Sequence, residues 1–380
     1  MKTKVLFVVQ GEGRGHMTQA ISMKQILDRN NFEVCGVLIG SSNRREIPQF
    51  FLDNFKDVTV QKIQSPNFVT SGNRKIKIWP TITHNFSNAK KYMQSARLLR
   101  HTIEEVDADV VLNFYEPTCG LYHLLLKKHR KIPMISVAHQ YLTGHKQFHF
   151  PKGHFMDKIM MKLYTDFTSA GSEHHLGLSF YPLENEKRSR IRVVPPLLRR
   201  EIMQTEVKSG NYFLCYLVNS GYVDDLVKWS ADFPEVTLHI FSDIKSDEEE
   251  REIRPNLTLH RLNDKKFLEY MAGCQGVISS AGFESVCEAM YLGKPVFMVP
   301  VEGHFEQLCN AVDALRAGAG IYDRTFKISR FLEWLPSWTS RSLSFQEWQQ
   351  QAEKIFVREL HSAISGEDHQ PHLESDLAAN

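Results

Sequence analysis

The sequence predicts an α/β protein built from two doubly wound, parallel-sheet domains that face each other across a cleft. Its 380 residues exceed what one hydrophobic core usually holds, so about two domains are expected. Short apolar runs alternate with longer segments of helical period, which is typical of parallel strands joined by crossover helices. This alternation occurs once before Pro195-Pro196 and once after it, so we place the domain boundary there.

The first alternation predicts one doubly wound domain over residues 1–197. Its strands are expected at Val5–Val9, Val34–Ile39, Val58–Ile63, Val110–Phe114 and Met134–Val137, with a strand-like run at Ile191–Val194. Its helices are expected at Met17–Arg29, Arg44–Phe55, Phe86–Val106 and Gly120–His129. Sheets of this kind bind ligands at the carboxyl ends of their strands. We therefore look for functional residues where these strands end.

The second alternation predicts a smaller domain over residues 198–340. Its strands are expected at Tyr212–Val218, Thr237–Phe241, Leu257–His260, Gly276–Ser279 and Val296–Val299, and two of its helices at Glu284–Leu292 and Phe305–Ala317. The segment 341–365 contains a helical stretch, Ser344–Ile364, that has no strand partner. The polar, acidic residues 366–380 are expected to be a disordered tail.

Composition excludes several classes of protein. No apolar run approaches the roughly 20 residues that a membrane-spanning helix needs, and the net charge of +2 does not favour a nucleic-acid partner. The six cysteines lack any C-x-x-C spacing, which argues against a zinc site or a disulfide framework. The apolar run Val5–Val9 is too short for a signal peptide. We expect a cytoplasmic protein without a metal.

A glycine-rich loop, Gln10 to His16, follows the first strand and leads into a helix. Glycines let such a loop turn sharply and bring N–H groups close to an anionic ligand. A dinucleotide-binding loop would need glycine where His16 stands, and the second strand ends in Ile39-Gly40-Ser41 without the acid that binds a ribose. The remaining alternative is a tight turn with a surface histidine. The place of His16 at a strand end favours a ligand loop.

The run from Val277 to Gly320 is the most specific signal in the chain. A strand ends in the small residues Ser279–Gly282, and the next helix begins there with free N–H groups that can hold a diphosphate. Glu288, about two turns into that helix, is placed to reach the hydroxyls of a ribose. Gly293-Lys294-Pro295 then ends the helix. Taken alone, Glu288 could be an ordinary exposed helical acid.

Together these residues resemble the C-terminal domain of nucleotide-sugar glycosyltransferases of the GT-B fold, two Rossmann-like domains around a cleft, and especially the family of the peptidoglycan transferase MurG. The matching parts are the small residues before the helix, Glu288-Ala289, Gly293-Lys294-Pro295, Pro300, and Gln307 followed by Asn310-Ala311. Gly15-His16 matches the end of that family's first glycine loop. Arg14 departs from its usual glycine, and Glu306 stands where a glutamine is usual.

The resemblance implies a transferase that moves a sugar from a nucleoside-diphosphate sugar, most often a UDP-sugar, to a hydroxyl, with inversion and without a metal. The sugar nucleotide is then a co-substrate, and no cofactor is expected. The donor would lie on the second domain and the acceptor on the first, and the final helix within residues 341–365 would cross back and pack on the first domain. The implied donor-binding residues are Glu288 for the ribose; Ser280, Ala281, Gly282, Ser220 and Gly221 for the phosphates; Leu262 and Asn263 for the nucleobase; and Glu306 and Gln307 for the sugar.

On the first domain, His16 is the candidate catalytic base, since imidazole can accept a proton near neutral pH. Gly15 and Arg14 would face the donor, with Arg14 and the helix after Gly282 stabilising the leaving diphosphate in place of a metal. His139 and Gln140, which follow the fifth strand, are candidate acceptor contacts. Asp107-Ala108-Asp109 has the spacing of a metal-binding motif, but it enters a strand rather than leaving one, so we interpret it as a turn.

The segment around Phe155–Leu163 bears on the acceptor. It predicts a helix with one apolar side and with Lys158 and Lys162 elsewhere. Such a helix either covers a core or lies on an anionic membrane surface, where a lipid or cell-envelope acceptor would be found.

Two other functions remain open from the sequence. A non-hydrolysing sugar-nucleotide epimerase shares this architecture but needs several acids in the cleft. A non-catalytic sugar-nucleotide-binding protein would keep Glu288 and the glycine loops but would need no base.

Overall fold

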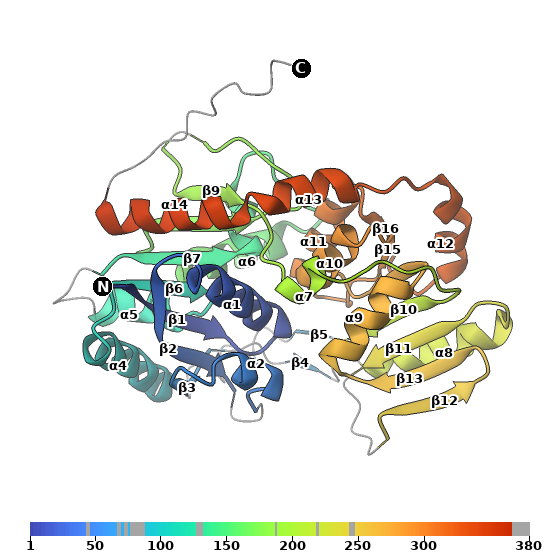
Figure 1. Cartoon of the computed structure of the whole chain (residues 1–380), viewed down its shortest axis with the longest axis horizontal. Helices are drawn as coiled ribbons and strands as arrows, with labels where there is room; N and C mark the ends of the chain where they lie inside the picture. The colour runs from blue at the N-terminus through green and yellow to red at the C-terminus, as the bar shows by residue number, and fades with distance from the viewer. Residues whose placement is uncertain are drawn as a thin grey trace.

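A computed structural model describes residues 1–42, 46–66, 70–71, 75–76, 88–126, 132–186, 188–217, 220–242 and 248–366. Two seven-stranded sheets, each flanked by helices, lie side by side in the molecule (Figure 1). This confirms the predicted fold class of two doubly wound α/β halves. Among the described residues, no helix is long and apolar enough to cross a membrane.

The first sheet is parallel throughout and has the strand order β3-β2-β1-β6-β7-β8-β9. Its strands are β1 (Thr3–Gln10), β2 (Phe32–Ser41), β3 (Val60–Gln64), β6 (Val110–Phe114), β7 (Met134–Ala138), β8 (His174–Leu178) and β9 (Ile191–Val194). The connecting helices are α1 (Arg14–Leu27), α2 (Gln49–Asn54), α4 (Ala89–Glu105), α5 (Thr118–Leu126), η1 (His139–Gly144) and α6 (Phe155–Thr168). Strands β4 (Thr70–Ser71) and β5 (Lys75–Ile76) form a separate antiparallel pair.

The second sheet has the order β12-β13-β11-β10-β14-β15-β16, with β12 antiparallel to β13 and the other pairs parallel. Its strands are β10 (Phe213–Leu217), β11 (Leu238–Ser242), β12 (Glu250–Arg254), β13 (Leu257–Arg261), β14 (Gly276–Ser279), β15 (Val296–Met298) and β16 (Gly320–Tyr322). Its helices are α7 (Arg200–Met203), η2 (Ser220–Tyr222), α8 (Val223–Asp232), α9 (Asp264–Gly273), α10 (Phe283–Tyr291), α11 (Phe305–Arg316), α12 (Ile328–Trp334) and η3 (Leu335–Ser337).

Three strands of the two seven-stranded sheets, β8, β12 and β16, have no counterpart in the sequence prediction. β8 contains two histidines and a glycine, so it does not read as an apolar run. β12 is polar and mostly exposed, as is usual for an edge strand. Asp109, in the turn that the Asp-x-Asp spacing suggested as a metal motif, accepts a hydrogen bond from the backbone N–H of Lys4 at 2.8 Å.

The prediction of one C-terminal helix over Ser344–Ile364 was wrong in detail. The chain forms two helices, α13 (Ser342–Gln350) and α14 (Ala352–Ser365), separated at Gln351. They run across the top of both halves in Figure 1. α13 packs against α10, and α14 packs against β7 and β9 of the first sheet. Gly366, at the start of the predicted tail, caps α14 with a φ of 70°, and residues 367–380 lie outside the described residues.

Candidate active site

A cavity of about 920 Å³ lies between the two halves and is lined by residues of both. Its walls come from the glycine loop and α1, from η1 and α6, and from the beginnings of α9, α10 and α11. It therefore sits at the carboxyl ends of the strands, where doubly wound sheets bind ligands. The predicted site residues that line it are Arg14, Gly15, His16, His139, Gln140, Leu262, Asn263, Gly282, Glu288, Glu306 and Gln307.

His16 is held in the first turn of α1, because that helix begins at Arg14, three residues before the predicted start. It is 8% exposed, so it is not the surface histidine of the alternative interpretation. Its Nδ1 lies 3.2 Å from Oε1 of Gln19, and its ring stacks on Tyr115 with 5.5 Å between ring centres. Burial lowers the pKa of His16. The ring is therefore neutral near pH 7, as a general base must be.

Glu284 is a cavity residue that the sequence prediction missed. It lies in the first turn of α10, where its Oε1 accepts a hydrogen bond from Nε2 of Gln19 in α1. A side chain at Gly15 would clash with its carboxylate. Burial raises the pKa of Glu284 to about 7, and the nearby Glu288 and Glu306 add to the shift. Its position four residues before Glu288 is the signal that could have found it, because residues four apart share one face of a helix.

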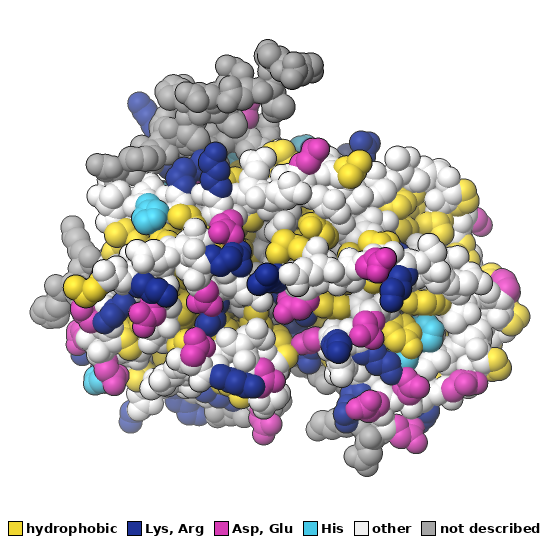
Figure 2. Space-filling view, in the orientation of Figure 1, with side chains coloured by type: hydrophobic (Ala, Val, Ile, Leu, Met, Phe, Trp, Pro, Cys, Tyr) yellow, Lys and Arg dark blue, Asp and Glu magenta, His cyan; other side chains and the backbone are white. Residues whose placement is uncertain are grey.

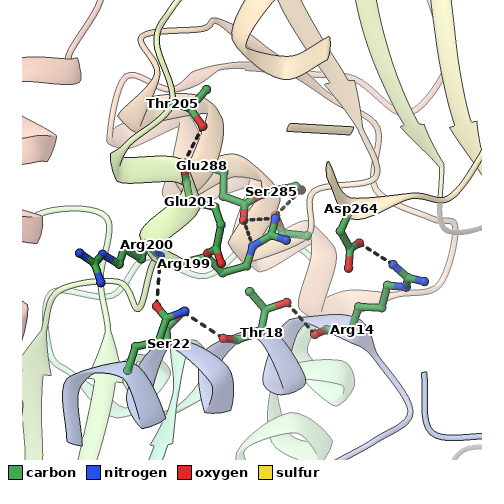
Figure 3. Close-up of polar contacts among 12 residues, drawn as sticks. Arg14, Thr18, Ser22, Arg199, Arg200, Glu201, Thr205, Asp264, Ser285 and Glu288 are labelled. Carbon is green, nitrogen blue, oxygen red and sulfur yellow. Dashed lines mark hydrogen bonds and ion pairs between the residues drawn. The ribbon is translucent and has the colours of Figure 1, made fainter. Parts of the chain in front are cut away.

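Glu288 is paired rather than exposed. Its Oε1 accepts two hydrogen bonds from Arg199, from Nε at 3.0 Å and from Nη2 at 2.7 Å (Figure 3). Burial raises the pKa of Glu288, and the charge of Arg199 opposes that shift. Arg199 lies in the segment that joins the two sheets. No local pattern in the sequence could predict this contact, because its two partners are 89 residues apart.

Arg14 and Asp264 form a second ion pair, which crosses the cavity from α1 to α9 at 2.8 Å (Figure 3). The Arg14 guanidinium also lies over the ring of Phe50, 4.9 Å from its centre. Both side chains are about one-third exposed, at 30% and 31%. The pair joins the two halves at the cavity wall that Leu262 and Asn263 form. Oδ1 of Asn263 caps α9 by accepting a hydrogen bond from the backbone N–H of Lys266.

Two predicted phosphate contacts, Ser280 and Ala281, lie behind the cavity wall. Both are buried and neither lines the cavity, so of the three residues predicted to line the diphosphate only Gly282 reaches it. Ala281 has a φ of 61°, so the chain turns sharply there and presents Gly282 instead. The carbonyl of Ala281 accepts a hydrogen bond from Nδ2 of Asn310. Among the described residues, Gly221 also lies off the cavity, at the start of η2 beside Ser220.

The first turn of α11 brings Glu306 and Gln307 to the cavity. Oε1 of Gln307 accepts the backbone N–H of Val301 at 2.9 Å, which fixes the loop before the helix. His304 caps the helix by accepting from the N–H of Gln307. Glu306 is half-buried and lies near enough to His16 to raise that histidine's pKa against the larger effect of burial.

His139 and Gln140, the candidate acceptor contacts, both line the cavity from η1. They are 3% and 4% exposed. Nδ1 of His139 donates to the carbonyl of Leu178 at 2.7 Å, and its ring stacks on Phe283 of α10 with 4.1 Å between centres. His139 thus packs against the second half of the molecule at the base of the cavity.

The residues 3–336 match the sequence model of glycosyl transferase family 1. The chain belongs to this family. It is therefore a glycosyltransferase, and the resemblance to nucleotide-sugar transferases of the GT-B fold is confirmed. No curated protein matches the sequence.

Solved glycosyltransferase structures share the fold of this family member over nearly its whole length. UGT89C1 of Arabidopsis thaliana, complexed with quercetin, has a TM-score of 0.62 at 14% identity, with 96% of this chain and 100% of that chain covered. LpCGTa in complex with UDP has a TM-score of 0.62 at 12% identity, with the same shares covered. The glycotransferase of kitacinnamycin has a TM-score of 0.60 at 14% identity, with 95% and 99% covered. At these identities the likeness shows the fold alone.

Proposed function

We propose that this glycosyltransferase moves a sugar from a UDP-sugar to an acceptor hydroxyl, with inversion at the anomeric carbon and with no metal or resident cofactor. The observation that carries the proposal is a buried His16, with its Nδ1 beside Gln19, in a cavity that both halves line. Two structures of the same fold support the choice of donor, since one was solved with UDP and another with UDP-L-rhamnose.

In this reaction the acceptor oxygen attacks the anomeric carbon while its proton passes to Nε2 of His16. The bond between that carbon and the phosphate oxygen breaks, and its electron pair leaves with the nucleoside diphosphate. A single displacement of this kind inverts the anomeric centre. The leaving group needs positive charge. The N-terminus of α10 behind Gly282 and the guanidinium of Arg14 are the groups that we propose for it.

The donor would lie along the second half of the cavity. Both donations from Arg199 go to Oε1 of Glu288, so we assign Oε2 to the ribose hydroxyls. We assign the wall at Leu262 and Asn263 to the nucleobase, and Glu306 and Gln307 to the sugar. We keep the prediction that the backbones of Gly15, Ser220 and Gly221 lie near the phosphates.

The first test is a panel of radiolabelled UDP- and GDP-sugars incubated with the protein, with nucleoside diphosphate and sugar products separated. We expect slow release of UDP and free sugar from one UDP-sugar in the absence of acceptor, and no release by His16→Ala with an unchanged melting temperature. An epimerised donor without UDP release would indicate the epimerase. Binding without any turnover would indicate a non-catalytic sugar-nucleotide-binding protein.

The acceptor side of the cavity is apolar, which supports an acceptor with a hydrophobic body. Beyond His139 and Gln140, α6 lines it with Met160, Met161, Leu163, Tyr164 and Phe167. The same helix leaves large apolar side chains in solvent, with Phe155 73% and Leu163 60% exposed. Lys152 and Lys162 are exposed beside them. We therefore propose that α6 docks on an anionic membrane surface and that the acceptor is a lipid or cell-envelope glycan carrier.

This docking is tested by sedimentation with vesicles of phosphatidylglycerol and phosphatidylcholine at low salt. We expect the protein to pellet with the anionic vesicles and Phe155→Ser/Leu163→Ser to stay in the supernatant. Leu343→Ser removes an equally exposed side chain, 76% exposed, from α13 and serves as the matched control. Equal pelleting of all three proteins, or of none, would contradict the proposal.

A further inference from the structure

The side chain that hydrogen-bonds His16 is an amide, Gln19, and an amide does not by itself fix which ring nitrogen of the histidine carries the proton. A general base must keep one ring nitrogen free, so the other nitrogen must carry the proton. A carboxylate beside Nδ1 enforces that tautomer because it can only accept. An amide can accept through its oxygen or donate through its nitrogen. In a serine protease, replacing the carboxylate beside the base by an amide lowers kcat about 10⁴-fold, because the histidine takes the wrong tautomer.

The contacts of the Gln19 side chain remove this ambiguity. Its Nε2 donates to Oε1 of Glu284, which leaves Oε1 of Gln19 to face Nδ1 of His16 at 3.2 Å. An ionised carboxylate has no proton to donate, so it can only accept from the amide nitrogen. The orientation of the amide is thereby fixed by Glu284. The proton of His16 then lies on Nδ1, and Nε2 keeps its lone pair.

The three residues come from both halves of the molecule. His16 and Gln19 are three residues apart in α1, and Glu284 lies in α10, 265 residues from Gln19. Gly15 allows the approach, because a side chain at that position would clash with the Glu284 carboxylate. Gln19 is 2% exposed, so water does not compete for its amide. The contact exists only while α1 and α10 lie together.

We propose that Glu284 and Gln19 form a relay across the two halves that holds His16 protonated on Nδ1, so that Nε2 is a competent base only in the closed molecule. The proposal rests on the proposed function, in which His16 is the catalytic base. Glu284 and Gln19 are positioning residues, since they act through His16. Closure of the cleft would then switch on the base at the moment when the substrates are enclosed.

The relay predicts a pH dependence. The groups around the two titrating side chains are as follows. Glu284 faces Gln19 and Gly15 of α1, and the carboxylates of Glu288, one turn along α10, and of Glu306, at the start of α11, lie near it. His16 faces Tyr115 and Glu306. Below the pKa of Glu284, about 7, its carboxyl can donate to Oε1 of Gln19 and turn the amide nitrogen toward His16. Burial holds the pKa of His16 below 6.5. The acid limb of kcat/KM should therefore report Glu284, near pH 7, and not His16.

The kinetic test compares wild type with Glu284→Gln, Gly15→Ala and the swap Gln19→Glu/Glu284→Gln. We expect the first two to lower kcat about ten- to hundredfold, with little change in donor KM, and Glu284→Gln to move the acid limb below pH 6.5. The swap places a carboxylate directly on Nδ1 of His16, so it should recover activity to within a few-fold of wild type. Glu269→Gln, an exposed acid of α9, is the control.

A second measurement does not need turnover. In protein labelled with ¹⁵N-histidine, the His16 signals are identified by their loss in His16→Asn. We expect Nδ1 of His16 to carry the proton in wild type and in the swap, and a mixture of the two tautomers in Glu284→Gln, because an amide at position 284 can either accept from Gln19 or donate to it. An unchanged tautomer and an unchanged acid limb in Glu284→Gln would overturn the relay. If wild type turns over no donor, the proposed function is refuted. The tautomer measurement then still decides the relay, because it does not depend on turnover.

Discussion

At the scale of single residues, burial decides which carboxylates matter. Glu116 is fully buried and Glu284 is half-buried, and burial raises the pKa of each to about 7. Glu284 gains a role from its place in the cavity. Glu116 lies outside the cavity lining, after β6, and is fully buried, where its Oε1 accepts from N and Oγ1 of Thr118. The charged form of Glu116 is therefore expected to destabilise the fold, and its position outside the cavity gives it no part in the proposed reaction.

Glu116→Gln is expected to stabilise the protein at alkaline pH. In the folded protein the pKa of Glu116 is about 7, above the ordinary value of about 4.3 that applies to the unfolded chain. The stability linked to the protonated carboxyl is therefore fully present below about pH 4.3 and is lost as the pH rises through about 7. An amide keeps the acceptor oxygen for Thr118 and carries no charge. We expect a gain of about 2–3 kcal/mol at pH 8 and almost none at pH 4.5, measured by urea unfolding.

The control for this change is Glu33→Gln, which alters an exposed acid on β2. It should change stability by less than about 0.5 kcal/mol at either pH. A gain for Glu116→Gln that is the same at pH 4.5 and pH 8 would show that the effect is not the burial of charge.

At the scale of elements, the C-terminal helices tie the two halves together. Trp348 of α13 donates from Nε1 to the carbonyl of Ser179, after β8, while α13 itself packs on α10. α14 then lies on the first sheet, where Glu359 pairs with His174 at 3.1 Å and Glu353 with Arg29 at 2.6 Å. The ring of Phe356 is fully buried beneath this helix. A segment without a strand partner is thus part of the core.

Phe356→Ala is expected to destabilise the first half by about 3–5 kcal/mol, because it leaves a cavity that the surrounding sheet cannot fill. Urea unfolding followed by tryptophan fluorescence measures this loss. Leu343→Ala, at an exposed position on α13, should cost less than about 0.5 kcal/mol. A small effect of Phe356→Ala would mean that α14 is not an integral part of the core.

At the scale of the whole molecule, polar contacts join the two halves around the cavity. Arg14 pairs with Asp264 at one side of the cavity, and Tyr181 donates to Oδ1 of Asp313 at 2.7 Å near its base. The Gln19 contact to Glu284 lies between the same two halves. On the face shown in Figure 2, acidic and basic side chains are intermixed, in keeping with the net charge of +2. Particular side-chain pairs thus join the two halves in this structure.

The sequence by itself predicted the fold class and most of the strands, because apolar periodicity is a local property and survives without knowledge of tertiary contacts. It also placed His16 and Glu288 at the ends of buried strands or in the helices that follow them, where parallel sheets bring ligands. It missed β12, whose polar residues need no burial at a sheet edge, and it merged α13 with α14 across Gln351.

The pairing of the site residues follows from tertiary contacts that no stretch of sequence contains. Three pairs join residues that are 89, 250 and 265 positions apart in the sequence: Arg199 with Glu288, Arg14 with Asp264, and Gln19 with Glu284. A local sequence pattern cannot predict contacts over such separations. Whether a carboxylate is exposed, paired or buried depends on what the fold packs against it, and that packing sets its pKa. The sequence determined which chemical groups reach the cleft, and the packing of the two halves determined which of them hold one another in place.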